Sequence, residues 1–199
     1  TITEYPLISK AKKYRSFQST LEGFFDALIQ TLHHSSVLYN DAALIENIQV
    51  WVASMSSAPI RPFRHTATVI ALSITSALCD IAQGVNSTIS TSRKQLESEK
   101  KKKNVNKGRA GAISNTVQEG EKKLETIDEL LRDTFDTVFV HRYRDVDPKI
   151  RAECMAALGR WIRSYREMFF EGQYLRYLGW VLSDTVAHTR AVVVAQLRS

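Results

Sequence analysis

The sequence predicts an all-α protein, a helical repeat solenoid from which a long antiparallel helical hairpin protrudes. Three observations lead to this fold class. Apolar residues recur at three- and four-residue spacing through most of the 199 residues, as on one face of a helix. Two long apolar stripes flank a basic segment that contains glycine. Near the C-terminal end, an Asp and Arg pattern occurs twice at a repeat-like spacing.

The first region, residues 15–60, predicts two amphipathic helices. The first has its apolar face on Phe17, Leu21, Phe24, Phe25, Leu28 and Leu32. Asn40 or Asp41 can cap the second helix, because a short polar side chain accepts hydrogen bonds from the free N–H groups of a first turn. The apolar face of this helix is predicted to hold Leu44, Ile45, Ile48, Trp51, Val52 and Met55.

Residues 62–138 predict the hairpin. Pro62 suits the first turn of a helix, where its missing N–H costs nothing. One stripe runs through Ile70, Ile74, Leu78, Ile81, Val85, Ile89, Ser92 and Leu96, and a second through Ile113, Val117, Gly120, Leu124, Ile127, Leu131, Phe135 and Val138. The segment Asn104 to Gly111 interrupts the pattern, with Gly108 and Gly111 able to form turns. We expect paired arms of about 25 residues, roughly 40 Å long at 1.5 Å per residue.

Residues 147–199 predict the first repeats of a HEAT-like solenoid. Asp147 and Asp184 lie 37 residues apart, and Arg151 and Arg190 lie 39 apart, each pair preceding an apolar helix. The second repeat stops without a polar capping helix, and Thr1 is not an initiator methionine. We therefore expect residues 1–199 to be a single N-terminal helical domain of a longer protein, with its repeats truncated.

Charge is concentrated in one place. Residues 93–109 hold eight Lys or Arg and two Glu, a balance of +6, and the other 182 residues sum to zero. A clustered positive charge of this kind favours an anionic partner, nucleic acid first. The alternative is an exposed, lysine-rich helix end with no partner, and charge alone does not separate the two.

Features of catalysis are not found in the sequence. The histidines do not occur in metal-binding spacing, and there is no phosphate-binding glycine loop or nucleophile elbow. We therefore expect no enzyme activity, no metal or cofactor, and no small-molecule substrate. Apolar runs stay far below the ~20 residues of a membrane span, so no membrane partner is expected. Cys79 and Cys154 lie among apolar residues, which predicts buried free thiols in a reducing compartment.

Two aromatic and arginine clusters fit a peptide site. Tyr143 and Arg144 lie between the hairpin and the first repeat, and Arg176, Tyr177 and Trp180 lie on a short predicted helix. Aromatic walls beside arginines suit an aromatic anchor in an acidic peptide. The alternative is ordinary packing, with the arginines at helix-end carbonyls and the aromatics in the repeat core.

A third group of cations lies at a predicted helix start. Arg61, Arg64 and His65 lie in a first turn, where positive charge is locally unfavourable because of the helix dipole. An anionic partner from outside the chain is one explanation of their presence.

Several stretches resemble the stromal antigen (SA/STAG) subunit family of cohesin. They are FVHRYRDVDPKIRAECMAALGRWIRSY from Phe139, YLRYLGWVLSDT from Tyr174, and SSAPIRPFRHTATVIALSITSAL from Ser56 to Leu78, with FRHTAT at its centre. The similarity extends from about Phe17 to Leu197, and its character is fungal rather than vertebrate. Gly172 stands where relatives carry an acidic residue.

The resemblance implies the N-terminal part of a hook-shaped HEAT-repeat protein in the nucleus, associated with chromatin. Its implied role is non-catalytic: supporting cohesin loading and sister chromatid cohesion in chromosome segregation. The implied partners are double-stranded DNA, the kleisin subunit (mainly through regions beyond this chain), and cohesin loader and regulator proteins.

Two sets of site residues follow from the resemblance. The family's protruding helical pair contacts DNA, which implies DNA-binding roles for Arg93, Lys94, Lys100, Lys101, Lys102, Lys103, Lys107 and Arg109. Its groove for phenylalanine-containing regulator peptides corresponds to Tyr143, Arg144, Arg176, Tyr177 and Trp180. The alternative function is a purely protein-docking scaffold whose basic segment meets an acidic protein.

Overall fold

The computed structural model describes residues 4–102 and 106–198, which form helices and no strand. The all-α prediction is confirmed. The elements are η1 (Lys12–Tyr14), α1 (Phe17–His34), α2 (Val37–Asn40), α3 (Ala42–Ser56), α4 (Arg61–Lys100), α5 (Lys107–Thr134), the π-helix η2 (Phe135–Phe139), α6 (Val140–Arg142), α7 (Pro148–Ser164), α8 (Arg166–Phe169), α9 (Gly172–Val181) and α10 (Ala187–Arg198).

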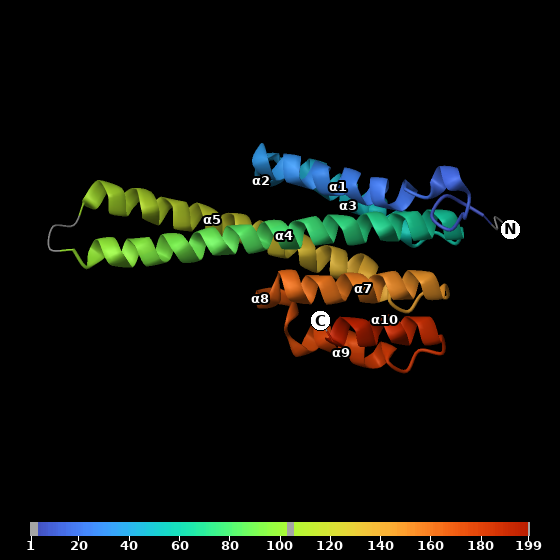
Figure 1. Ribbon diagram of the computed structural model, residues 1–199. Helices are drawn as coiled ribbons and strands as arrows, with labels where there is room; N and C mark the ends of the chain where they lie inside the picture. Colours follow the sequence, from blue (N-terminus) through green and yellow to red (C-terminus); the bar gives the residue numbers. More distant parts are fainter. Residues whose placement is uncertain (1–3, 103–105, 199) are drawn as a thin grey trace.

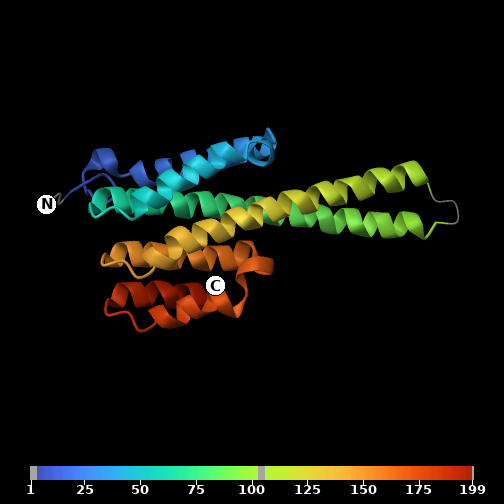
Figure 2. The same cartoon turned by 180° about the vertical axis from the view of Figure 1, so that it is seen from behind.

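The predicted hairpin is confirmed as α4 and α5. The two helices run antiparallel, and their far halves project well beyond the body of the protein (Figures 1 and 2). Helix α4 has 40 residues, roughly 60 Å at 1.5 Å per residue, with Pro62 in its first turn. All of the predicted stripe residues are buried or partly buried, with Ile89 3% and Val117 8% exposed on the projecting part of the hairpin.

The break between the arms is shorter than predicted. Helix α5 begins at Lys107, so Gly108 and Gly111 lie inside its first turns rather than in a loop. The Asn106 side chain starts the helix by accepting a hydrogen bond from the Arg109 N–H at 3.0 Å. No described glycine has a positive φ, so these two residues are not needed for a turn.

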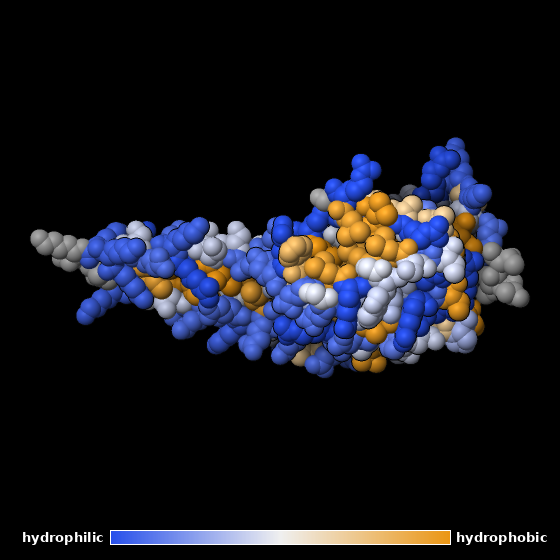
Figure 3. Space-filling view, turned by 90° about the horizontal axis from the view of Figure 1, so that it is seen from below, coloured by the Kyte–Doolittle hydropathy of each residue, from blue (hydrophilic) through white to orange (hydrophobic). Residues whose placement is uncertain are grey.

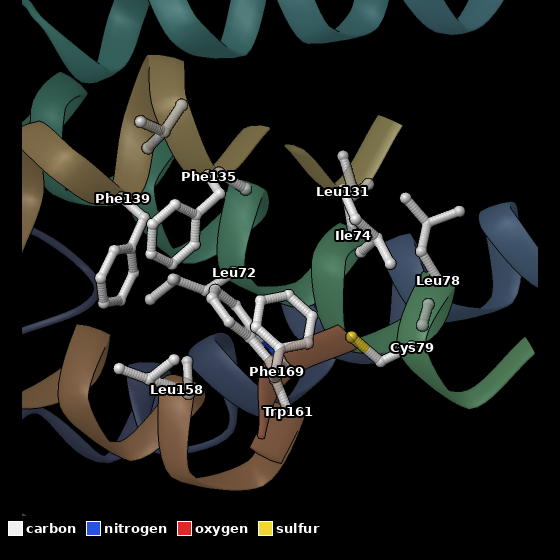
Figure 4. Packing of buried hydrophobic residues seen from close by; sticks show 14 of the residues in the cluster. Leu72, Ile74, Leu78, Cys79, Leu131, Phe135, Phe139, Leu158, Trp161 and Phe169 are labelled. Carbon is white, nitrogen blue, oxygen red and sulfur yellow. The ribbon is translucent and has the colours of Figure 1, made fainter. Parts of the chain in front are cut away.

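The apolar core surrounds the first half of α4, which packs against α1, α3, α5 and α7. Figure 4 shows its side chains meeting aromatic residues of η2, α7 and α8. Trp161 is 1% exposed and donates its indole N–H to the Ser76 hydroxyl at 2.9 Å. Burial raises the pKa of the Cys79 and Cys154 thiols, and both are free, as the sequence predicted.

Helix α4 is long and apolar enough to cross a membrane by composition alone. An 18-residue window within it has a mean hydropathy of 1.5, although the sequence contains no long uninterrupted apolar run. Of that window, 72% is buried inside the structure. The apolar character of α4 is therefore used in packing against the neighbouring helices.

The predicted faces of the first two helices were wrong in part. Phe24 on α1 is 60% exposed, and Trp51 on α3 is 68% exposed. Leu44 and Met55 are also exposed, at 40% and 37%. Helix α3 is apolar on two sides. Periodicity therefore did not show that only the side with Ile45 and Val52 packs on the core.

The Asp41 cap at the start of α3 is confirmed, because the Asp41 carboxylate accepts the Leu44 N–H at 3.3 Å.

Buried arginine–aspartate pairs join successive layers of the body. Arg64 Nε donates to Asp145 at 2.9 Å, and Arg151 Nε donates to Asp184 at 2.6 Å. Each guanidinium also donates to a loop carbonyl six residues earlier, at Ala58 and Asp145 respectively. The same geometry in two layers shows that the loops are held by one repeated interaction.

This interaction corrects the repeat alignment. The Asp145 and Asp184 carboxylates each accept the N–H two residues on, and each pairs with the arginine, Arg64 or Arg151, that also donates to the carbonyl six residues before it. Asp145, not Asp147, is therefore the counterpart of Asp184, and their spacing of 39 residues equals that of Arg151 and Arg190.

The cations at the start of α4 have partners inside the protein, which corrects the suggestion of an outside anion. Arg61 pairs with Asp147, and the buried His65 bridges the Tyr5 hydroxyl and the Glu153 carboxylate, both at 2.7 Å. Burial works to raise the pKa of Asp147, but the Arg61 and backbone hydrogen bonds outweigh it and lower that pKa.

We predict that Gly120→Leu destabilises the hairpin. A Cβ at Gly120 would lie 2.7 Å from Ile89 Cγ1, so a side chain there forces the arms apart, at a cost of about 1–3 kcal/mol. Gly111→Leu is the matched control, since Gly111 is also on α5 and has no atom within 4 Å of its added Cβ. Thermal unfolding followed by circular dichroism measures both. An equal melting temperature for the two variants would contradict the close packing.

Candidate DNA-binding tip and aromatic surface

The basic segment lies at the far end of the hairpin, where α4 ends and α5 begins. Viewed from below, the projecting arms are mostly hydrophilic, whereas hydrophobic surface gathers on the body (Figure 3). Pairing the arms covers their apolar stripes and leaves the cations exposed to solvent. The tip can therefore meet a large ligand without interference from the body.

Three of the predicted DNA-binding residues are engaged by carboxylates. Arg93 on α4 pairs with Glu121 on α5 at 2.5 Å, which joins the two arms. Lys102 and Arg109 both approach Glu99, at 2.5 Å and 3.9 Å. Their charge is partly neutralised within the protein.

Glu99 is a buried acid beneath the basic tip. It is only 4% exposed, and its carboxylate also accepts the Asn106 N–H at 3.4 Å. The hydrogen bond from Lys102 is the main reason that its pKa is lowered. Sequence reasoning counted Glu99 only as a charge, although its position three residues before Lys102 is a usual spacing for a helical ion pair.

The remaining described cations of the tip are Lys94, Lys100, Lys101 and Lys107. All four are exposed, and none has an ion-pair partner among the described residues. Lys103 lies outside the described residues. Unpaired ammonium groups at a protruding tip suit phosphate oxygens, which they contact without regard to base sequence.

A second basic cluster was missed. Lys10, Lys12, Lys13 and Arg15 are exposed around η1, at the end of the body opposite the tip (Figure 1). Four cations within six residues are a clear signal in the sequence. The sequence analysis overlooked it because acidic residues elsewhere bring the net charge of the other 182 residues to zero.

The aromatic residues predicted for the peptide site lie together. The Tyr143 and Tyr177 rings meet edge to face at 4.9 Å, and those of Tyr177 and Trp180 at 5.2 Å. Tyr177 is 5% exposed and forms the base, while Trp180 is 54% exposed. Tyr143 and Trp180 are 6.4 Å apart at 31°, so they form a continuous aromatic surface.

Two phenylalanines support this surface: Phe135, which the sequence analysis placed only on an apolar stripe, and Phe139, to which it gave no role. Phe139 stacks on Tyr143 at 6.0 Å, and Phe135 stacks on Phe139 at 4.5 Å. Their four-residue spacing along η2 and α6 aligns the rings from the core to the surface. The aromatic surface is therefore anchored in the core and held rigidly.

The two predicted arginines lie in different surroundings. The Arg176 guanidinium lies 5.4 Å from the Tyr177 ring and 5.3 Å from the Trp180 ring, in cation–π contact with both. Arg144 lines a separate hollow of about 540 Å³ with Ala58, Pro59 and Val146 among its neighbours. Only Arg176 is stacked on the aromatic surface.

Family models match two parts of the chain. The STAG domain matches residues 3–116, more than half of the chain, which includes α1 to α4 and the tip. The chain belongs to the STAG-domain family. A second model, the stromalin conservative domain, matches residues 144–199, where Arg144, Arg176, Tyr177 and Trp180 lie.

Members of the STAG family resemble the chain throughout. Cohesin subunit psc3 of Schizosaccharomyces pombe is 44% identical over 98% of this chain and 20% of its own length. Cohesin subunit scc-3 of Caenorhabditis elegans is 36% identical over 94% of this chain and 17% of its own length. The solved structure of cohesin subunit Scc3 from Z. rouxii matches with a TM-score of 0.89 and 29% identity, over 97% of this chain and 22% of that one. The chain thus spans about a fifth of the length of the relatives it matches.

Proposed function

We propose that this STAG-family chain is the N-terminal part of a non-catalytic cohesin subunit that acts on chromatin in the nucleus. The matching relatives are named as cohesin subunits, and the helical fold agrees with that of Scc3 along nearly the whole chain. Its role would be to support cohesin loading and sister chromatid cohesion. The kleisin, cohesin loader and regulators are the partners that this role requires.

The hairpin tip is proposed to bind duplex DNA without sequence specificity. The observation that carries this proposal is the set of exposed lysines at the end of the projecting hairpin that have no ion-pair partner among the described residues. Each phosphate that a lysine neutralises releases counterions and contributes about −0.9 to the slope of log affinity against log salt. Residues 93–109 contain no aromatic side chain to stack on bases, which favours the duplex backbone over single strands.

The aromatic surface is proposed to bind a phenylalanine-containing acidic peptide of a regulator. Trp180 offers a half-exposed ring to an aromatic anchor, and Arg176 beside it is exposed and has no carboxylate partner among the described residues. Arg144 lies on the adjoining surface, where it can meet a second acidic residue of an extended peptide.

The alternative is a protein-docking scaffold whose tip lysines meet an acidic protein rather than DNA. Lysine ammonium groups accept carboxylates as well as phosphates, so the geometry of the tip suits both ligands. A competition experiment distinguishes the two ligands. If the tip binds DNA, unlabelled duplex displaces a labelled duplex far more readily than poly-glutamate does.

Neutralising Lys100, Lys101 and Lys107 to Gln is expected to weaken duplex binding and to lower the salt slope by about 2–3. Fluorescence anisotropy with a labelled duplex, repeated across a salt series, gives both quantities. The matched control neutralises Lys10, Lys12 and Lys13 to Gln, which changes net charge equally at the opposite end of the body. Equal losses in the two variants would mean that DNA binding depends on overall charge and not on the tip.

Glu99→Gln is expected to strengthen duplex binding several-fold. The substitution removes the carboxylate that engages Lys102 and Arg109, so both cations become available to phosphate. The same anisotropy titration measures it, with Glu121→Gln as the control that releases Arg93 on the arm. Weaker binding by Glu99→Gln would show that Glu99 acts by ordering the tip.

Trp180→Ala is expected to lower affinity for a Phe-containing acidic peptide roughly thirtyfold, because loss of a central aromatic contact costs about 2 kcal/mol. Phe170→Ala is a close control: Phe170 is also 54% exposed and also carries a stacked guanidinium, that of Arg166 at 4.6 Å. Isothermal titration with the same peptide compares them. Equal effects of the two substitutions would contradict a site at Trp180.

A further inference from the structure

A groove separates α3 from α5 on a part of the body that none of the proposed sites uses. Both helices pack beside α4, and α2 lies at one end of the hollow between them, which measures about 570 Å³. Its base is formed by the buried side chains of Leu38, Ile45 and Leu130. Val50 lines the groove while 66% exposed, so the groove presents apolar surface to solvent.

The walls of the groove are tied together. The Gln49 side-chain N–H₂ on α3 donates to the Leu130 carbonyl at 3.1 Å and to the Thr134 hydroxyl at 2.9 Å, both on α5. These hydrogen bonds bridge the two helices at the groove itself. The groove is therefore preformed, and binding of a ligand includes no free-energy cost of opening it.

Three carboxylates rim this apolar base. Glu46 projects from α3, and Glu129 and Asp133 project from α5. All three are exposed, and none has a hydrogen-bond or ion-pair partner among the described residues. The groove lining contains no cation, and the Lys123 ammonium lies outside the lining, 5.4 Å from the ring of the lining residue Tyr39.

The other exposed apolar residues of α3 do not belong to this groove. Leu44, Trp51 and Met55 recur at seven- and four-residue spacing, so they share one face of the helix, and none of them lines the groove. Val50 is therefore the exposed apolar side chain that α3 contributes to the groove.

We propose that the α3–α5 groove binds a basic segment of a partner protein, in which an apolar side chain is flanked by Lys or Arg. The apolar residue would enter the groove over Leu38, Ile45 and Leu130, and the cations would pair with the rim carboxylates. Charge decides the kind of ligand: the rim repels nucleic acid and acidic peptides, although the whole chain has a charge of +6.

This surface is chemically opposite to the other two. The tip and the aromatic surface present cations to anionic ligands, whereas the groove presents carboxylates to a cationic one. One chain can therefore hold a basic partner segment and an acidic peptide at once without competition between them. The inference does not depend on the tip or the aromatic surface performing its proposed role.

The test uses a fluorescein-labelled peptide that repeats Lys-Leu-Lys-Ala and a peptide of equal charge that repeats Lys-Ser-Lys-Ala. Anisotropy titrations with the 199-residue chain are expected to show about tenfold tighter binding of the leucine peptide, because only leucine buries apolar surface in the groove. The combined variant Glu46→Gln, Glu129→Gln and Asp133→Asn is expected to lose about tenfold in affinity.

The matched control neutralises three exposed carboxylates outside the groove, with the substitutions Asp26→Asn, Glu97→Gln and Glu119→Gln. It should retain parental affinity, and Val50→Ser should lose several-fold without lowering the melting temperature, because Val50 is largely exposed. No binding of the leucine peptide, or an equal loss in the control, would overturn the proposal. So would sedimentation showing that the groove instead holds the basic tip of a second copy, with self-association abolished by the groove variant.

Discussion

The architecture depends on one continuous helix that is buried in two different ways. The first half of α4 is enclosed by four other helices, and its second half is covered only by α5. A single apolar stripe serves both halves, because the residues that meet the core and those that meet the other arm follow the same spacing. At Gly120 the arms come so close that an added Cβ would lie 2.7 Å from Ile89 Cγ1. This approach keeps the arm narrow, and the narrow arm carries the basic tip away from the body.

The tip, the aromatic surface and the α3–α5 groove differ in which charged groups are left without a partner inside the fold. Internal pairs neutralise the cations of the helix starts, so Arg64 and Arg151 hold the layers together and are not available to ligands. Glu99 holds part of the charge of the tip within the hairpin. Cations without an ion-pair partner among the described residues include those at the tip, around η1 and at Arg176, and the unpaired carboxylates of the groove lie on the body. The same residue types therefore act as structural or as binding groups according to whether a partner lies within the fold.

Much of this could be predicted from the sequence where a pattern is local. The helical period, the Asp41 cap and the hairpin follow from neighbouring residues, and all appear in the structure. Choosing between two apolar sides of α3 was not possible, because the choice depends on where α4 lies. The alignment of the repeats failed for a related reason: Asp145 and Asp147 are equally plausible by spacing, and only their partners Arg64 and Arg61 distinguish them.

By itself, the sequence determined the all-α class, the long basic hairpin, the resemblance to the stromal antigen family and the identity of the aromatic residues near Trp180. These depend on periodicity, composition and residue order, which are properties of neighbouring positions. Only the tertiary structure decided which cations are free, that Phe135 and Phe139 support Tyr143, and that three separate carboxylates rim one groove. The physical reason is that pairing and enclosure depend on distances between residues far apart in the chain, and those distances exist only once the helices have packed.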